Sequence, residues 1–491
     1  MPPSRAGEFR QGLLAGALAF ALLLPGVASA EESSASPRLS WETGEGKSFA
    51  IPAFEVAGFI FGLNQFNRHF SDSNDYNSDP QTIWKNLKSP LVIDSDPFSV
   101  NQIGHPYQGS IYYGFARSAG LSYWQSMLYT MAGSFLWETA GEKVPPSLND
   151  HIASGIGGTF VGEPLFRMAS LLLEGGGETP GFWRELGAAL ISPSTGFNRL
   201  VFGDRFKDVF PSRNPAVFIR LRLGATLTTE VSSGGLSDNT KQQEGYAEYS
   251  ISYGLPGKPG YRYMRPFDYF HFEFTLVPNA STAANAFENV STRGLLVGTD
   301  YDWGDTYRGL WGLFGIFDYL SPQLFRISTT AVSVGTVAQW WLSPAVALQG
   351  TALGGLGFGA AGSVGDRAER DYHYGLVPQV LLTMRLILGE RAMLEAGGRG
   401  YFVAGVGSGG GVSSSNIGGE VITRGNAGLT VRIYGPHAIG LQYLVSTRDT
   451  SSSHGVPDRH QSVQTISVSY NFLGHTRFGA VEWRPGGSGD R

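Results

Sequence analysis

Apolar and polar residues alternate with a period of two along many short segments between residues 217 and 472. The clearest segment is FHFEFTL at 270–276, where Phe270, Phe272 and Phe274 share one face and His271 and Glu273 share the other. Successive side chains of a strand point to opposite faces, so the pattern predicts strands with one apolar and one polar face. A soluble β-sandwich also alternates in this way, and the rest of the chain has to distinguish it from a membrane barrel.

Twelve such segments can be counted, and they begin near residues 217, 245, 267, 290, 306, 325, 345, 372, 392, 420, 438 and 462. An even number suits a single chain that closes into an antiparallel barrel. Closure is required in hydrocarbon because the edge of an open sheet has unpaired backbone groups there. The count therefore favours a barrel of about twelve strands.

The first thirty residues have the pattern of a secretory signal peptide. Arg5 and Arg10 precede a short apolar stretch at 13–24, and Ala28-Ser29-Ala30 fits the small-residue cleavage rule. The stretch is too short to span a bilayer as a helix, so an uncleaved anchor is the less favoured alternative. We expect cleavage after residue 30 and a flexible, Ser-rich start at 31–51.

Composition agrees with an exported barrel. Aromatic residues make up 13% of the 491 residues, yet the mean hydropathy is close to zero, as expected when half of each strand faces a polar lumen. The chain has no cysteine, which excludes disulfides and thiolate metal sites, and its formal charge of −5 gives no reason to expect nucleic-acid binding. No run of about 20 apolar residues is present, as a membrane helix would require.

These features predict an α+β chain with a helical domain at 52–210, a transmembrane antiparallel barrel at 211–474 and a C-terminal extension at 475–491. The expected location is the outer membrane of a Gram-negative bacterium. The expected partners are outer-membrane lipids, the barrel-assembly machinery during biogenesis and other envelope proteins. We expect the helical domain to dock at the periplasmic mouth of the barrel or partly to plug it.

Within the helical domain the pattern predicts helices at 52–70, 121–140, about 149–174 and 179–190, with Asn149 or Asp150 as the N-cap of the third. Three separated prolines predict an extended segment with turns at 84–107. Small residues, among them Gly155, Gly158 and Gly162, predict that the third helix closely approaches a neighbour.

Several short motifs of this half resemble a bacterial family of unknown function. They are NQIGHPYQG at 101–109, ARSAGL at 116–121, WETAGE at 137–142, PSLND at 146–150 and GEP at 162–164. The resemblance covers about residues 80–210. It implies a helical region paired with an outer-membrane barrel, and it implies no activity, so no catalytic residue follows from it.

Polar residues that could carry chemistry gather in the same half: His105, Glu138, Glu142, Asp150 and Glu163. Carboxylates near a histidine can perform acid–base catalysis or bind a divalent metal, and Ser147 or Ser154 could then attack a lipid ester. The favoured alternative is structural, with Asp150 as a helix cap and Arg117 paired with Glu138 or Glu163. We therefore predict no metal and no cofactor, and whether the protein is an enzyme stays open.

The polar faces of the strands predict the residues that line the barrel: Arg220, Arg222, His271, Glu273, Arg385, Glu395, Arg399 and Arg432. Their excess of arginine is compatible with an anion-favouring pore. The favoured alternative is a ladder of Arg–Glu pairs that fills a narrow lumen. Tryptophans near the strand ends are expected to form interface girdles: Trp303, Trp311, Trp340, Trp341 and Trp483.

The predicted function is that of an envelope channel or an assembly scaffold. The alternative is a hydrolase of outer-membrane lipids with its site in the helical domain.

Overall fold

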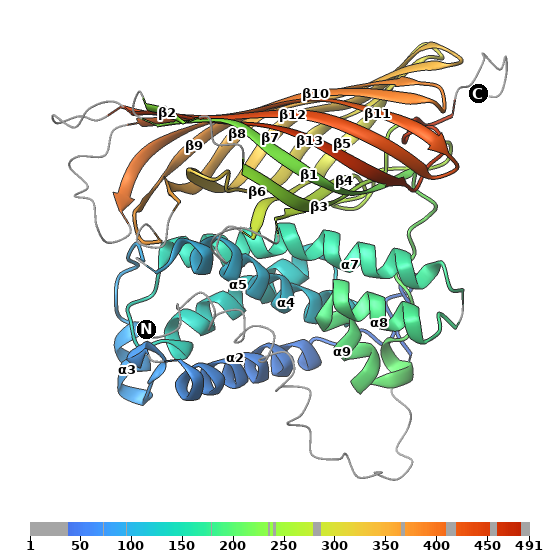
Figure 1. The fold of residues 1–491 in the computed structure, drawn as a ribbon. Coiled ribbons are helices and arrows are strands. Elements are labelled where there is room, and N and C mark those ends of the chain that lie inside the picture. The colour runs from blue at the N-terminus through green and yellow to red at the C-terminus, as the bar shows by residue number, and fades with distance from the viewer. Residues whose placement is uncertain are drawn as a thin grey trace. The chain divides into compact units, whose positions relative to one another are not determined.

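The chain divides into two compact units, Met1–Ser212 and Arg213–Arg491 (Figure 1). The computed structural model describes residues 38–482 except 72, 95, 178, 234–235, 239–241, 278–285, 365–368, 409–418 and 452–458. The predicted signal peptide, Trp483 and the end of the C-terminal extension lie outside the described residues.

The first unit is helical. Its α-helices are α2 (Ala50–Phe70), α3 (Pro80–Asn86), α4 (His105–Ser118), α5 (Tyr123–Leu136), α6 (Leu148–Asp150), α7 (Gly158–Glu174), α8 (Phe182–Ile191) and α9 (Pro193–Val201). Three π-helical segments lie between them: η2 (Val100–Gly104), η3 (Trp137–Gly141) and η4 (His151–Gly157). Short 3₁₀ turns are η1 (Asn74–Tyr76) and η5 (Gly203–Phe206). Helix α4 is central and packs against α2, α5, α7 and α9. Among the described residues, no helix is both long enough and apolar enough to cross a bilayer.

The predicted close helix approach is confirmed between α4 and the start of α7. A Cβ atom added to Gly109 would lie 1.9 Å from the carbonyl oxygen of Ser154, and one added to Gly158 would lie 2.6 Å from the Cα of Gly109. Only glycine permits this backbone contact. Gly162 likewise faces the ring of Tyr113 in α4, whereas Gly155 faces Met131 in α5.

Two predictions for this unit are wrong. The segment 84–107 is not extended throughout, because α3 runs to Asn86, η2 covers 100–104 and α4 begins at His105. Pro106 lies in the first turn of α4, where a missing N–H has no cost. The N-cap before Asp150 is Ser147, whose hydroxyl accepts from the Asp150 N–H, so neither Asn149 nor Asp150 is the cap. Helix α9 was not predicted at all.

The second unit is a closed antiparallel barrel. Its strands are β1 (Val217–Ser233), β3 (Gln242–Tyr253), β4 (Phe270–Leu276), β5 (Phe287–Trp303), β6 (Tyr307–Leu320), β7 (Phe325–Ser343), β8 (Val346–Ser363), β9 (Tyr372–Leu388), β10 (Ala392–Ser408), β11 (Gly419–Tyr434), β12 (His437–Thr450) and β13 (Arg459–Leu473). Each strand pairs with the next, and β13 pairs with β1, which closes the sheet (Figure 1). The short β2 (Leu236–Asp238) pairs with β1. The prediction of a twelve-strand closed barrel is confirmed.

The two faces of the barrel differ sharply in chemistry. Along β9 the side chains of Val380, Leu382 and Met384 are exposed, while Leu381 and Thr383 line an internal cavity. The other exposed apolar side chains of the strands include Leu223, Val297, Leu313, Val334, Leu356, Phe402, Val421, Leu429, Val431, Ile433, Ile439, Leu441, Ile466, Val468, Tyr470 and Phe472. The exterior is therefore a broad apolar surface, and polar side chains are concentrated inside.

The two ends of the barrel have different connections. At the end where β1 begins and β13 stops, here called the terminal end, several strands are joined by turns of two or three residues, at 304–306, 344–345, 389–391 and 435–436. At the opposite end, here called the loop end, β4 and β5, β8 and β9, β10 and β11, and β12 and β13 are separated in the sequence by eight or more residues. A 16-residue connection at 254–269 is the exception at the terminal end.

Candidate functional site

Three of the candidate residues come together in the helical unit. His105 is the first residue of α4, Glu138 lies in η3, and Asp150 ends α6. One potential ligand atom from each lies within 4.8 Å of the other two. All three side chains are buried, with exposures of 5%, 2% and 3%.

The hydrogen bonds around these residues orient them toward one another. Nδ1 of His105 lies 3.0 Å from Ser154 Oγ, and Nε2 lies 3.8 Å from Asp150 Oδ1, which is too long for a hydrogen bond. The Ser147 N–H donates to Glu138 Oε2 at 2.9 Å, whereas Oε1 of Glu138 is buried with no hydrogen-bond partner among the described residues. Asn149 Nδ2 donates to Asp150 Oδ1 at 2.8 Å.

The backbone at this site is unusual. The π-helical segment η2 ends immediately before His105, η3 contains Glu138, and η4 begins immediately after Asp150. Each π-helical turn inserts an extra residue and rotates the following side chains relative to a regular helix. Such turns are rare and often occur at functional sites.

Acidic side chains are concentrated here without a basic counterpart. Among the described residues, no lysine or arginine forms an ion pair with Glu138, Glu142 or Asp150. Burial first, and then neighbouring carboxylates, raise the pKa of Glu138, Glu142 and Asp150 well above their usual values. Burial lowers the pKa of His105, so the imidazole is neutral in this environment. The group can hold a proton or a cation.

Glu142 and Glu163 lie outside this trio. Glu142 accepts a hydrogen bond from Trp137 Nε1 at 2.8 Å. Glu163 accepts from Arg117 Nε at 2.9 Å and from Arg167 Nε at 2.7 Å, and the Tyr113 hydroxyl donates to it at 2.6 Å. Burial raises the pKa of the Glu163 carboxyl, but the two arginines outweigh burial and hold it below its usual value. Glu163 is therefore neutralised within the helical unit, and Arg117 pairs with it and not with Glu138.

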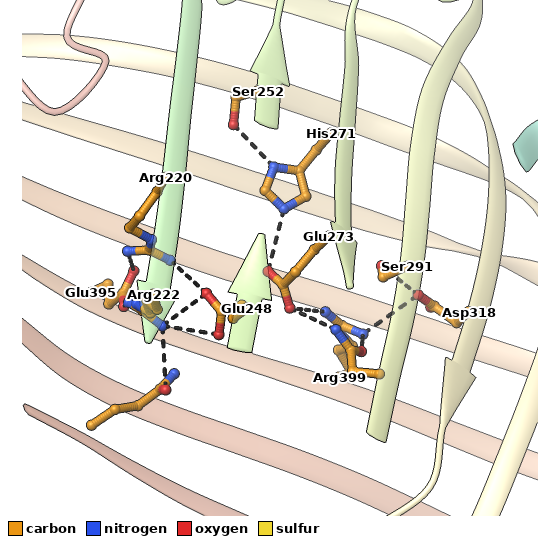
Figure 2. Close-up of polar contacts among 12 residues, drawn as sticks. Arg220, Arg222, Glu248, Ser252, His271, Glu273, Ser291, Asp318, Glu395 and Arg399 are labelled. Carbon is orange, nitrogen blue, oxygen red and sulfur yellow. Dashed lines mark hydrogen bonds and ion pairs between the residues drawn. The ribbon is translucent and has the colours of Figure 1, made fainter. Parts of the chain in front are cut away.

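A network of ion pairs crosses the barrel lumen (Figure 2). Arg220 and Arg222 each contact both Glu248 and Glu395, which come from strands far apart in the sequence. Arg399 contacts Glu273 at 3.7 Å and Asp318 at 3.5 Å. His271 Nδ1 lies 3.0 Å from Ser252 Oγ and its Nε2 lies 3.5 Å from Glu273 Oε2. Figure 2 shows the ring between these two side chains. The side chains predicted on the polar faces thus meet inside.

An internal cavity of about 130 Å³ lies beside this network. Six arginines and four glutamates line it: Arg220, Arg222, Arg293, Arg385, Arg399, Arg424, Glu248, Glu273, Glu288 and Glu395. Among the described residues, Arg293 and Arg385 form no ion pair, and Arg385 instead lies over the ring of Phe218 at 5.5 Å. With His271 neutral, the lining has a formal charge of +2. The lining of the cavity is therefore formally positive.

Arg432, also predicted to face the lumen, is not among the residues that line this cavity. Its guanidinium donates to the carbonyls of Glu390, Gly435, His475 and Thr476. It holds the strand turns and the following residues together at the terminal end.

The residues 475–481, here called the C-terminal segment, lie against the inner face of the barrel. Gln339 donates to the Val481 carbonyl at 2.9 Å and accepts from the Val481 N–H at 2.9 Å. Gln349 donates to the Gly479 carbonyl at 2.9 Å. Gln339 and Gln349 also line the cavity, so the segment is hydrogen-bonded to the wall of the cavity at the terminal end.

Sequence reasoning missed Glu248, Arg293, Asp318 and Arg424, although each lies on the polar face of its strand and period two could have found them. The tryptophans that were predicted to form interface girdles differ in their exposure. Trp303, Trp311 and Trp340 are exposed, but Trp341 is buried and donates its Nε1–H to the Val481 carbonyl, so it belongs to the interior.

Comparisons with known proteins bear on both units. No curated protein matches the chain. Residues 90–194 match the family described as "Domain of unknown function (DUF3943)". This range contains His105, Glu138, Asp150 and Glu163.

Among solved structures, the chain is similar to the toluene transporter TodX of Pseudomonas putida, with 10% identity, a TM-score of 0.23, and coverage of 53% of this chain and 90% of that one. It is also similar to the outer membrane channel DcaP of Acinetobacter baumannii, with 9% identity, a TM-score of 0.24, and coverage of 52% and 96%. The KdgM porin matches with 6% identity, a TM-score of 0.23, and coverage of 52% and 99%.

The chain therefore combines a helical unit, in which residues 90–194 match a domain of unknown function (DUF3943), with a closed twelve-strand antiparallel barrel.

Proposed function

We propose that the barrel is embedded in the outer membrane and is a channel, closed at rest, for small anionic solutes. The embedding is supported by the exterior, where exposed Leu, Val, Ile and Phe side chains cover strand after strand. A soluble monomer rarely exposes so extensive an apolar surface. Three exposed tryptophans, Trp303, Trp311 and Trp340, lie toward the terminal end, where an aromatic girdle belongs. Short turns are typical of the periplasmic side, so the terminal end is assigned to the periplasm.

The closed resting state is supported by the side chains and the C-terminal segment that occupy the lumen. The ion pairs cross its middle, and the C-terminal segment covers the terminal end. A buried apolar cluster lies toward the loop end: Leu320, Phe325, Ile327, Ala361, Val377, Tyr401, Val403 and Ile422. A solute must displace at least one of these barriers, so passage requires a rearrangement at an end.

The anion preference is carried by one observation, the two arginines of the cavity that form no ion pair among the described residues, Arg293 and Arg385. A buried guanidinium without a carboxylate is costly, and an anionic solute would supply the missing charge. Arg220, Arg222 and Arg399 already pair with carboxylates in the lumen, so the anion preference is proposed for Arg293 and Arg385 alone.

The test is single-channel recording of the full chain in planar bilayers under a KCl gradient. The wild type should open rarely, and its reversal potential should lie close to the equilibrium potential of chloride. Gln339→Ala removes both side-chain contacts to Val481 and should raise the open probability severalfold. Arg385→Gln, added to the Gln339→Ala variant, should shift the reversal potential toward the equilibrium potential of potassium. Arg391→Gln, in an exposed turn, should not shift it. If neither the wild type nor Gln339→Ala conducts, the channel proposal fails and a scaffold role takes its place.

The second candidate is a hydrolase of outer-membrane lipids in the helical unit. The observation that favours it is the 3.0 Å contact between Ser154 Oγ and His105 Nδ1, with Asp150 on the other side of the ring. Ser154 is buried, so a substrate would have to open the unit first. Ser154→Ala should then abolish a change in the lipid profile while the unit stays folded, and an unchanged profile in a strain lacking the whole protein would end this candidate.

A further inference from the structure

The buried carboxylates of the helical unit have two different kinds of surroundings. Glu163 is neutralised by Arg117 and Arg167 at hydrogen-bonding distance. Glu138 and Asp150 are as deeply buried, yet no lysine or arginine pairs with them among the described residues. Because uncompensated buried charge is expensive, the second arrangement requires either protons or a cation.

The hydrogen bonds leave ligand atoms free in this second arrangement. Ser154 Oγ can accept from Nδ1–H of His105, which leaves the lone pair of Nε2 directed toward Asp150 Oδ1. Orientation of a ligand histidine through its other nitrogen is the usual arrangement behind metal sites. Glu138 contributes a buried Oε1 with no hydrogen-bond partner among the described residues, while its Oε2 is held by the Ser147 N–H.

The distances also favour a shared cation over direct contacts. Nε2 of His105 and Oδ1 of Asp150 are 3.8 Å apart, too far for a hydrogen bond, and the three ligand atoms lie within 4.8 Å of one another. An ion bound at about 2.0–2.2 Å from each donor would bridge them after a movement of less than about 1 Å. Asp94, held by Asn101 at 3.1 Å, lies close enough to influence Asp150 electrostatically and adds negative charge to the surroundings.

We propose that His105, Glu138 and Asp150 bind one divalent transition-metal ion, with Zn²⁺ as the representative of the class. Two carboxylates and a neutral imidazole balance a charge of 2+ and form a nitrogen–oxygen donor set that suits Zn²⁺ better than Mg²⁺. The ion ties together the start of α4, the segment η3 and the end of α6, which are three separate parts of the sequence. This inference departs from the sequence prediction of no metal, and it does not depend on the channel proposal.

The first experiment measures binding with the full chain in detergent, purified through a tag without histidine, stripped with EDTA and titrated calorimetrically with Zn²⁺ alone. The wild type should bind one ion per chain. Glu138→Gln and Asp150→Asn should each weaken binding at least tenfold. The controls are Glu42→Gln, an exposed glutamate, and His69→Gln, a histidine near the end of α2, and both should bind as the wild type does. Absence of one-to-one binding by the wild type, or wild-type affinity in both ligand variants, overturns the proposal.

The second experiment separates a metal site from a cluster of protonated acids, and it also covers variants that fold poorly. In EDTA, Glu138→Gln should unfold at a higher temperature than the wild type, because one of the crowded carboxylates is gone. Zn²⁺ should raise the unfolding temperature of the wild type by several degrees and leave that of Glu138→Gln unchanged. Co²⁺ added to the wild type should give visible ligand-field absorption. The proposal is contradicted if the wild type unfolds at the same temperature with and without Zn²⁺ and gives no Co²⁺ absorption. This outcome requires no variant.

Discussion

At the scale of single residues, the partner of a buried carboxylate decides how it affects stability. Glu163 and Glu55 are both buried in the helical unit, but Glu163 has two arginines and a tyrosine around it. Neither carboxyl oxygen of Glu55 has a hydrogen-bond partner among the described residues, and the nearby Asn198 donates its Nδ2–H to Phe115 O and Ser118 Oγ. The two residues should therefore respond oppositely to loss of charge.

Glu163→Gln should destabilise the helical unit by about 3 kcal/mol, because it leaves two buried guanidinium groups without a compensating charge. The helical circular-dichroism signal of the full chain, followed during thermal unfolding at pH 7, measures this. Glu42→Gln, at an exposed position, is the control and should leave the midpoint unchanged. Equal midpoints for wild type and Glu163→Gln would show that the cluster contributes nothing.

Glu55 predicts a pH dependence. Burial raises the pKa of Glu55 from its ordinary value of 4.5 to about 8. The folded state therefore binds the proton more tightly than the unfolded state, and stability falls as the pH rises from about 4.5 to about 8, by at most about 5 kcal/mol. Glu138, Glu142 and Asp150 act in the same direction. Glu55→Gln should make the fall of the unfolding temperature between pH 5 and pH 9 shallower, and a slope equal to that of the wild type would refute this assignment.

At the scale of elements, the strands could be predicted because their signal is local. Alternation along 270–276 needs no information from elsewhere in the chain, and β4 has these same bounds. Helix α4 was missed because Pro106 reads as a loop residue until it is placed in the first turn of a helix.

The glycine contact between α4 and α7 gives a prediction at this scale. Gly158→Ala places a methyl group 2.6–3.0 Å from backbone atoms of Gly109 and Ser110, so the two helices must separate at a cost of about 1–3 kcal/mol. Gly187→Ala in α8 is the matched control, since its methyl group meets only the end of the Leu172 side chain. The control should be neutral or slightly stabilising. Thermal unfolding of the helical signal compares them, and equal midpoints would argue against backbone contact.

At the scale of the whole molecule, the candidate sites could be predicted only in part. The sequence identified His105, Glu138 and Asp150 as candidates. Their convergence could not be predicted, because His105 lies at least 33 positions before either carboxylate in the sequence. Likewise Arg220 and Glu395 meet only because the sheet closes and brings distant strands across one lumen. Residue types were visible in the sequence, whereas the pairing that leaves Arg293 and Arg385 without a carboxylate was not. The docking of the helical unit at the barrel mouth stays a prediction.

The central claim is that acyl chains solvate the outer face of the barrel. The chain has no cysteine, so single-cysteine variants along β9 at 380, 381, 382, 383 and 384 can be spin-labelled without background. In lipid vesicles, collisions with oxygen should dominate at positions 380, 382 and 384, whose native side chains are exposed, and should be low at 381 and 383, which line the cavity. If the positions 380, 382 and 384 instead collide mainly with a water-soluble nickel chelate, the outer face is in water and the account of a membrane barrel is wrong.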